Sequence, residues 1–170
     1  CVLRRSQHDV LLWAREPEVV AAINGQGVNP IFLSGTPLVA GIRATSDLRQ
    51  AVQDCDFILM AVPAQHVRTI AGSMRQWLRR LTPVVSCSKG VERGSCALMP
   101  EVLADMLPEA VVAVLSGPSF AREIAADLAC GGYVSSIGDG LDLRIDVLAR
   151  HAYTVELRMS YGLVDPQTGL

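Results

Sequence analysis

The chain has 170 residues, of which half are hydrophobic and only 5% are aromatic, and its formal net charge is −2. This length suffices for one domain with a hydrophobic core, and the near-neutral charge gives no electrostatic reason to expect nucleic-acid binding. Every apolar run is far shorter than a membrane span. The five cysteines are scattered without a Cys-x-x-Cys pair, and the three histidines have no partners at metal-ligand spacing. We therefore expect neither a disulfide framework nor a metal site, and the cysteine usage fits a reducing cytoplasm.

Strand and helix patterns alternate along the chain. The Val-, Ile- and Leu-rich runs are typical of strands buried on both faces of a sheet, and the run at 57–62 is expected to be a central parallel strand. The alternation predicts an α/β fold whose sheet is parallel and has right-handed crossovers. Asp47 is expected to cap the helix that follows it. The predicted strands cover 9–13, 42–45, 57–62, 83–87, 111–116, 133–137 and 153–158, and the predicted helices cover 1–5, 17–24, 48–53, 65–81, 97–107, 117–128 and 141–150.

Open sheets of this kind bind ligands beyond the carboxyl ends of their strands, so the residues that follow each strand are candidates for a site. Lys89 follows the strand predicted at 83–87, and it is the single lysine of a chain with 14 arginines. A compact ammonium between small residues can hold an anionic substrate, and Gly90 allows tight backbone geometry beside it. A surface lysine without a ligand is the alternative.

A second candidate anion site follows the strand predicted at 111–116. Pro118 suits the first position of a helix, and the free N–H groups of that first turn, with the Ser119 hydroxyl and the preceding Gly117, can bind an anion. Ordinary capping by glycine and serine is the alternative. Because Lys89 and this turn follow strands of one sheet, we expect them to converge.

Two further strand ends could contact a nucleotide. Arg15 and Glu16 follow the first predicted strand, where an acid accepts from the ribose 2′-hydroxyl of NAD and an arginine favours the 2′-phosphate of NADP. Arg15 can also stack on adenine, while a surface ion pair between these two residues is the alternative. Pro63 ends the 57–62 run abruptly, and the small residues beside it would let a cofactor approach the backbone.

Four segments match, in the same order, the sequence motifs of a known family. They are 12–18 (LWAREPE), 61–65 (AVPAQ), 88–94 (SKGVERG) and 115–123 (LSGPSFARE). In these motifs the chain resembles the bacterial glycerol-3-phosphate dehydrogenases. The resemblance implies a Rossmann-like, doubly wound parallel sheet followed by a helical substrate domain. It also implies reversible reduction of dihydroxyacetone phosphate by NAD(P)H to sn-glycerol 3-phosphate for phospholipid synthesis, in a cytoplasmic enzyme that forms a homodimer.

The matched motifs also carry expected contacts. Lys89 falls where the family contacts both the cofactor and the substrate, and Arg15 falls at the adenosine end of the cofactor. The arginine gives NADP a slight preference over NAD, although Glu16 points the other way. The cofactor-binding residues implied by the resemblance are Arg15, Pro63, Lys89 and Ala121, and the substrate-binding residues are Lys89, Gly117 and Ser119.

The chain departs from the family in three places. The Gly-rich fingerprint and its strand are absent, so we expect a sheet that lacks its first, central strand and exposes two strand edges. The family's catalytic lysine lies in a Gly-x-x-Lys-Asn segment of the second domain, and since Lys89 is the only lysine, we expect that group outside this chain. The match weakens after residue 128. We therefore predict an incomplete dinucleotide-binding domain over 1–158 and a divergent tail over 159–170, without the helical substrate domain.

These departures predict an internal piece of an enzyme that does not turn over substrate alone. A non-catalytic nucleotide-binding or regulatory module is one alternative. A related dehydrogenase, of the hydroxyacyl-CoA or 6-phosphogluconate type, is another, although the pairing of Lys-Gly-x-Glu with Gly-Pro-Ser-Phe argues against it.

Overall fold

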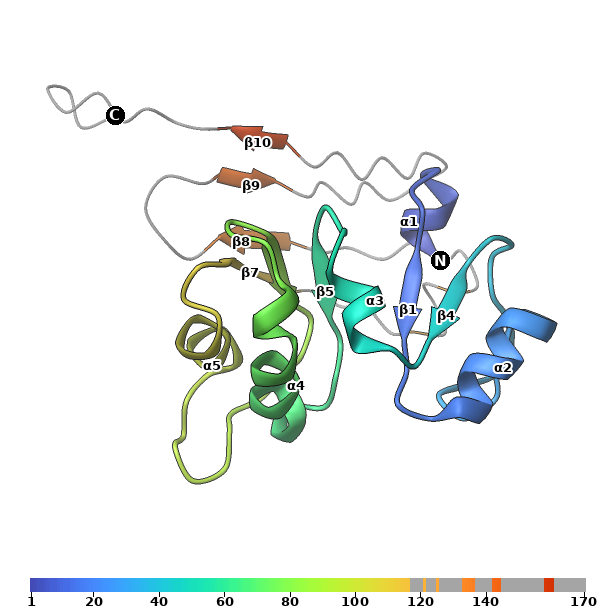
Figure 1. Cartoon of the computed structure of the whole chain (residues 1–170), viewed down its shortest axis with the longest axis horizontal. Coiled ribbons are helices and arrows are strands. Elements are labelled where there is room, and N and C mark those ends of the chain that lie inside the picture. Colours follow the sequence, from blue (N-terminus) through green and yellow to red (C-terminus); the bar gives the residue numbers. More distant parts are fainter. Residues whose placement is uncertain (117–120, 122–124, 126–132, 137–141, 145–157, 161–170) are drawn as a thin grey trace, which may run out of the picture. The chain divides into compact units, whose positions relative to one another are not determined.

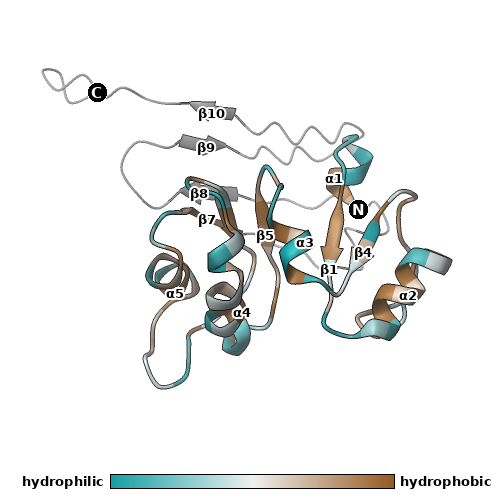
Figure 2. Ribbon diagram, viewed as in Figure 1, coloured by the Kyte–Doolittle hydropathy of each residue, from teal (hydrophilic) through white to brown (hydrophobic). Residues whose placement is uncertain are grey.

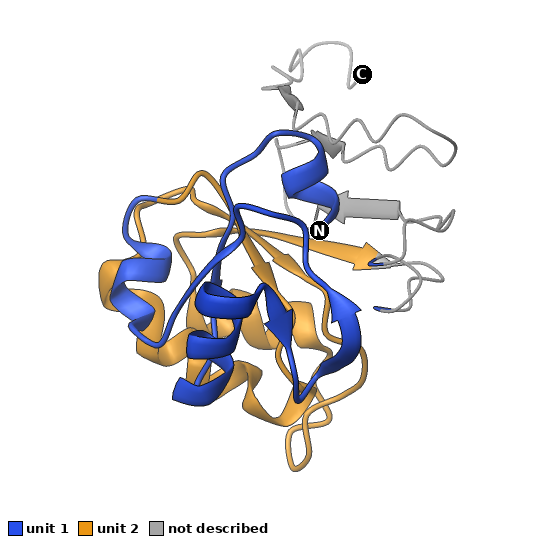
Figure 3. Ribbon diagram, turned by 90° about the vertical axis from the view of Figure 1, so that its right-hand side faces the viewer, with its two compact units in different colours: residues 1–54, 117–132, 146–155 blue, residues 55–116, 133–145, 156–170 orange. Residues whose placement is uncertain are grey.

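The computed structural model describes residues 1–116, 121, 125, 133–136, 142–144 and 158–160. These residues fall into two compact units, which Figure 3 draws in different colours. The first unit contains the described residues of 1–54 together with 121 and 125. The second contains 55–116, 133–136, 142–144 and 158–160, and each unit has a sheet of its own.

The first unit has a two-stranded parallel sheet with helices packed against it (Figure 1). Strands β1 and β4 form this sheet, with Leu12 opposite Ala44. Helix α2 packs against β4 and α3 against β1, while β2 and β3 form an antiparallel hairpin. The elements are α1 (Val2–Arg5), β1 (Leu11–Trp13), α2 (Pro17–Gln26), β2 (Val28–Asn29), β3 (Leu33–Pro37), β4 (Arg43–Thr45) and α3 (Leu48–Val52).

The hydrophobic core of the first unit joins α2 to the two strands. Figure 2 shows hydrophobic residues along β1 and much of α2. Asn24 of α2 adds a polar connection, since its Nδ2 donates to the Ala44 carbonyl at 2.9 Å and its Oδ1 accepts from the Ala44 N–H at 2.8 Å. Helix α2 ends at Gly27, whose φ of 66° lies in the left-handed region that favours glycine. The buried core residues are Ala14, Val19, Ile23 and Ala44, with Leu12, Val20, Leu38 and Ile42 packed against them.

The second unit contains a four-stranded sheet in the order β5, β6, β7, β8. The first three strands are parallel, and β8 pairs antiparallel to β7. A separate antiparallel pair is formed by β9 and β10. The elements are β5 (Ile58–Met60), η1 (Ala64–His66), α4 (Val67–Met74), η2 (Arg75–Trp77), β6 (Pro83–Ser86), α5 (Met99–Met106), β7 (Val111–Ser116), β8 (Tyr133–Ser136), β9 (Asp142–Arg144) and β10 (Arg158–Ser160).

Two helices provide the hydrophobic core of the second unit. Helix α4 packs against α5, and α5 packs against β6 and β7. Strand β6 is buried along its whole length, so it forms the centre of this layer. The buried residues from these elements are Val67, Ala71, Met74, Val84, Val85, Met99, Val102, Leu103, Val112 and Ala113.

Most elements predicted from the sequence are present. The strands at 83–87 and 111–116 are β6 and β7, and the Asp47 side chain caps α3 by accepting from the N–H groups of Arg49 and Gln50. Among the described strands, β1 pairs only with β4 and β5 only with β6. Each therefore has one edge without a described strand.

Three predictions about the sheet are wrong. The run at 57–62 gives β5, which is not central but lies at the end of the described four-stranded sheet, with Leu59 38% exposed. The prediction failed because an apolar run indicates burial and does not tell how many strands pair with it. The sheet is not parallel throughout, since Ser116 pairs with Tyr133 and the chain returns beside β7. The predicted helix at 141–150 contains the strand β9, because its alternation of apolar and polar residues also fits the twofold period of a strand.

Other predictions are changed or fall outside the described residues. The helix predicted at 65–81 is divided into η1, α4 and η2, with tighter 3-10 turns at its ends. The predicted helix at 117–128 is described only at Ala121 and Ala125, which are helical. The predicted boundary between 158 and 159 falls within β10, and the residues on both sides of that strand lie outside the described part of the chain.

Candidate functional site

The carboxyl ends of β5 and β6 are adjacent, because the strands are parallel and Met60 lies opposite Ser86. The pairing continues one residue further, where the Cys87 N–H donates to the Met60 carbonyl at 2.9 Å. The loop that contains Pro63 and the loop that contains Lys89 therefore leave the sheet at one edge. The structure thus brings together two of the residues predicted from the sequence.

Ser88 ties these two loops together. Its Oγ donates to a carbonyl of β5 at 3.2 Å and to the carbonyl of Val62 beyond it. On the other side of Lys89, Gly90 has a φ of 121°, and a Cβ there would lie 3.7 Å from the Ala64 Cβ. Lys89 is exposed between these two fixed neighbours, so its ammonium can reach a ligand at the edge of the sheet.

Cys87, two residues before Lys89, is not a nucleophile at neutral pH. Burial raises the pKa of its thiol to about 11. The reactive form of cysteine is the thiolate, which is a very small fraction of Cys87 at pH 7. Cys87 therefore supplies no charge at this strand end.

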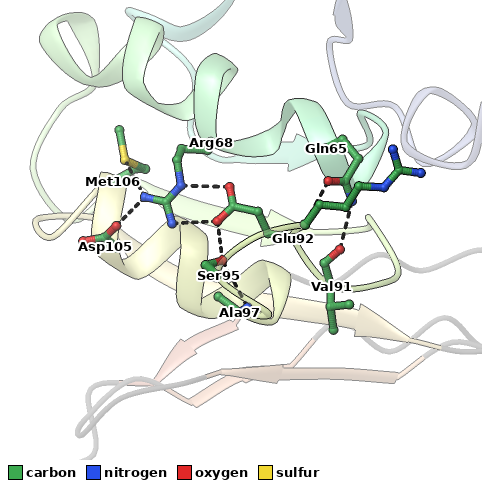
Figure 4. A network of polar contacts seen from close by, with 9 residues as sticks. Gln65, Arg68, Val91, Glu92, Ser95, Ala97, Asp105 and Met106 are labelled. Carbon is green, nitrogen blue, oxygen red and sulfur yellow. Dashed lines mark hydrogen bonds and ion pairs between the residues drawn. The ribbon is translucent and has the colours of Figure 1, made fainter.

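The loop beyond Gly90 is held by a polar network that Figure 4 shows in close view. Gln65 of η1 binds its backbone twice: Nε2 donates to the Val91 carbonyl at 2.9 Å, and Oε1 accepts from the Arg93 N–H at 3.0 Å. The single side chain therefore links the segment after β5 to the segment after β6.

Arg68 of α4 makes the second connection. Its Nε donates to Oε1 of Glu92 at 2.8 Å and its Nη2 donates to Oε2 at 3.0 Å, a bidentate pair in which both groups are planar. Its Nη1 donates to Asp105 of α5 (Figure 4). Arg68 thus joins α4, the Lys89 loop and α5.

Glu92 is the most enclosed charge of this network, with its side chain 14% exposed. The Arg68 guanidinium and the Ser95 hydroxyl, which donates to Oε2 at 2.6 Å, lower the pKa of the Glu92 carboxyl. Glu92 is therefore ionised at neutral pH. Its backbone N–H also donates to the Ala97 carbonyl at 2.9 Å, and its carbonyl accepts from the Cys96 N–H at 3.0 Å, which closes the base of the loop.

The structure describes two of the other predicted site residues, and both belong to the first unit. Arg15 lies in the first unit with its side chain 79% exposed, and it makes the ion pair with Glu16 that was the alternative interpretation, with Nε 3.5 Å from Oε1. Ala121 is helical and exposed. Gly117 and Ser119 lie outside the described residues, so their expected convergence with Lys89 stays a prediction.

Sequence reasoning gave no role to Gln65, Arg68 or Glu92. Two of them lie within matched motifs, Gln65 in 61–65 and Glu92 in 88–94. A local signal existed, because Gln65 and Arg68 are three residues apart and so share one face of a helical segment. The partners of Gln65 and Arg68, 24 to 38 residues away, could not be read from the sequence.

No group of three or more His, Cys, Asp or Glu side chains among the described residues could hold a metal ion. None of the described helices is both long enough and apolar enough to cross a membrane.

Comparison with known proteins identifies a family to which this chain is similar. The family model of the NAD-dependent glycerol-3-phosphate dehydrogenase N-terminus matches residues 1–139. The glycerol-3-phosphate dehydrogenase [NAD(P)+] of Paramagnetospirillum magneticum is 50% identical over 125 residues, which are 74% of this chain and 45% of that relative. The enzyme of the same description from Caulobacter vibrioides is 50% identical over 127 residues, 75% of this chain and 38% of the relative. The chain thus spans less than half the length of these relatives.

Solved structures of glycerol-3-phosphate dehydrogenases are also similar to this chain. The glycerol-3-phosphate dehydrogenase of Coxiella burnetii superposes with a TM-score of 0.73 at 31% identity, covering 81% of this chain and 42% of that one. The enzyme of Saccharomyces cerevisiae gives a TM-score of 0.68 at 26% identity, covering 76% and 39%. These likenesses confirm the predicted Rossmann-like α/β fold.

Proposed function

Because the chain belongs to the family of the NAD-dependent glycerol-3-phosphate dehydrogenase N-terminus, we propose that it forms the dinucleotide-binding part of an enzyme that interconverts dihydroxyacetone phosphate and sn-glycerol 3-phosphate. The observation that carries this proposal is the position of Lys89. It is the only lysine of the chain, and it is exposed where two parallel strands end side by side. Such an edge is where open α/β sheets bind their ligands.

The residues at this edge fit an anionic dinucleotide. Ala64 and Gly90 are small, and a Cβ at Gly90 would meet nothing nearer than Ala64 at 3.7 Å, so a ligand can approach the backbone. Lys89 supplies a positive charge beside them. We assign cofactor contacts to Pro63 and Lys89 in the second unit and to Arg15 and Ala121 in the first.

When bound, a dihydronicotinamide supplies the hydride that reduces the ketone carbon. Lys89 holds the negatively charged substrate and stabilises the charge that develops on its oxygen during reduction. Cys87 stays a neutral thiol at pH 7, so it does not take part as a base. The proton that completes the alcohol is assigned to the family's catalytic lysine, which has to come from outside this chain because Lys89 is its only lysine.

The remaining assignments follow the family. We place Gly117 and Ser119 at the substrate phosphate, because the sequence predicts a helix there whose first turn would offer free N–H groups. The whole protein is proposed to be a cytoplasmic homodimer that serves phospholipid synthesis. The dinucleotide-binding domain is assigned to residues 1–158, and a helical substrate domain is proposed for the whole protein.

Arg15 is proposed to give NADP a slight advantage over NAD. Its side chain is 79% exposed and forms a 3.5 Å ion pair with the adjacent Glu16, so it can turn towards a 2′-phosphate. An Arg15→Ala change should weaken NADPH binding about tenfold and leave NADH binding nearly unchanged, because only NADPH loses a charge-assisted contact. Equal losses for both cofactors would assign Arg15 to the adenine instead.

The activity is tested best in a chimera. The aligned 125-residue segment of this chain replaces its counterpart in the Paramagnetospirillum magneticum enzyme, which supplies the rest of the protein. We expect NADPH oxidation with dihydroxyacetone phosphate, and no turnover with a 3-oxoacyl-CoA or, in the oxidative direction, with 6-phosphogluconate. A chimera that binds NADPH but does not turn over dihydroxyacetone phosphate would instead identify a non-catalytic nucleotide-binding module.

A further inference from the structure

The loop that begins at Lys89 is anchored from outside by side chains of η1 and α4. Building on the proposed function, we propose that Gln65 and Arg68 are positioning residues that fix the loop and thereby hold Lys89 at the ligand edge. Neither side chain acts on the ligand in this account. Each acts through the backbone or the carboxylate of the loop.

Gln65 controls the backbone next to Lys89. Its amide uses both of its functional ends, accepting from the Arg93 N–H and donating to the Val91 carbonyl, within 3.0 Å in each case. The two bonds reproduce what a neighbouring strand would offer to these residues. Val91 and Arg93 lie two and four residues after Lys89. While Gln65 keeps its hydrogen bonds to them, the segment that carries Lys89 cannot move away from β6.

The anchoring continues on the near side of Lys89. The Ser88 hydroxyl donates to the last carbonyl of β5 and to the Val62 carbonyl beyond it, and Gly90 lies against Ala64 of the segment that follows. The residues before and after Lys89 are therefore both tied to the segment that contains Pro63 and Gln65. A long, flexible lysine side chain gains most from this arrangement, since a fixed Cα removes part of the entropy that ligand binding would otherwise cost.

Arg68 acts one helical turn further on. It holds Glu92 by two hydrogen bonds and reaches Asp105 of α5 with its remaining nitrogen, so the loop is fixed to α4 and α5 (Figure 4). The Ser95 hydroxyl donates a further hydrogen bond to the Glu92 carboxylate. Arg68 therefore holds the loop through the Glu92 carboxylate, while Gln65 holds it through its backbone.

The test uses the 170-residue chain and its single lysine. Reductive methylation with ¹³C-formaldehyde places a dimethylammonium label on Lys89, whose NMR signal reports the lysine directly and keeps its charge. The Lys89 signal is recognised by its loss in Lys89→Arg, in which the label at the chain's own amino terminus remains. Inorganic phosphate and NADPH are the probes, and amide hydrogen exchange measures the order of the loop.

We expect Gln65→Met to accelerate exchange of the Arg93 amide about fivefold or more, as the loss of a net hydrogen bond implies. Amides of Val85 and Val112 should be unaffected. The phosphate affinity at Lys89 should fall by a similar factor. Gln65→Glu should keep the acceptor for Arg93 but lose the donor to Val91, so its effect should be intermediate. The matched control is Gln76→Met, an exposed residue of η2 at the other end of α4.

The proposal is overturned if the Arg93 amide exchanges at the same rate in Gln65→Met as in the wild-type chain. It is also overturned if the loop loosens while the Lys89 signal and its phosphate affinity stay unchanged. A wild-type chain whose Lys89 signal responds to neither probe would contradict the proposed function. The exchange rates would still decide whether Gln65 holds the loop, so the two failures are distinguishable.

Discussion

Arg68 and Glu92 meet with their planar groups aligned, and two hydrogen bonds of 2.8 and 3.0 Å join them. One partner belongs to α4 and the other to the loop after β6, so the pair connects a core helix to the ligand edge. The carboxylate side chain is only 14% exposed, which distinguishes this pair from the solvent-exposed ion pairs that contribute little to stability.

The first prediction concerns the acid stability that Glu92 confers. Its pKa is lowered in the folded chain, so the contribution of Glu92 is present above the pKa of an unfolded glutamate, about 4.3, and is lost as the pH falls through the lower folded value. Glu92→Gln should lower the melting temperature at pH 7. The difference from wild type should shrink progressively below about pH 4.3, where the wild-type carboxylate also becomes protonated.

The matched control for this change is Asp105→Asn. Asp105 contacts the same arginine, but its side chain is 64% exposed. Thermal melts from pH 7 to pH 3 should show a clearly smaller effect for Asp105→Asn. An effect of Glu92→Gln that persists undiminished at pH 3 would contradict the linkage.

A second prediction contrasts two glycines. Gly90 has space for a Cβ, but its φ of 121° is strained for any L-residue, so Gly90→Ala should cost about 1–3 kcal/mol of unfolding free energy. Gly25 lies inside α2 with nothing within 4 Å of its Cβ position, so Gly25→Ala should stabilise by about 0.5–1 kcal/mol. Urea unfolding of the two variants should therefore shift the midpoint in opposite directions. A shift in the same direction would show that the loop tolerates another φ at residue 90.

A third prediction tests the core of the second unit. Leu103 of α5 is fully buried, and Leu103→Ala should cost about 2–5 kcal/mol because it leaves a cavity. Leu98, just before the same helix, is 52% exposed, so Leu98→Ala should change the unfolding free energy by about 0.5 kcal/mol or less. Equal losses in urea unfolding would mean that α5 does not pack on the sheet as described.

A fourth prediction uses the cysteines. Because burial raises the pKa of Cys87 to about 11, its alkylation by iodoacetamide should be slow at pH 8 and increase steeply towards that value. The exposed Cys96 provides the comparison within the same loop and should react much faster at pH 8. Mass spectrometry of timed digests would locate the label. Early modification of Cys87 at pH 8 would contradict its burial.

Some of this structure was accessible from the sequence. Apolar runs located β6 and β7, and Asp47 marked the start of α3, because buried strands and helix caps are determined by nearby residues. The β2–β3 hairpin was missed, since Leu33–Pro37 has little apolar alternation. The antiparallel direction of β8 could not be predicted either, because strand direction depends on the path of the chain between β7 and β8.

The candidate site, too, could be predicted from the sequence only in part. Pro63 and Lys89 were identified because each follows a strand, and the parallel pairing of β5 with β6 brings their loops together. The contacts that hold those loops, from Gln65 to Arg93 and from Arg68 to Glu92, join residues far apart in sequence. Single-residue patterns contain no information about such pairs, so the network became visible only in three dimensions.

The most direct test of the account compares Lys89→Met and Lys89→Arg in the chimera with the Paramagnetospirillum magneticum enzyme. If the ammonium stabilises charge on the substrate, Lys89→Met should lower kcat/KM for dihydroxyacetone phosphate by about 10²–10³, as loss of one group that stabilises developing charge does. Lys89→Arg should keep the charge but change its geometry, and should lose less. A Lys89→Met variant that retains full kcat/KM would contradict the central claim that this lysine binds the substrate.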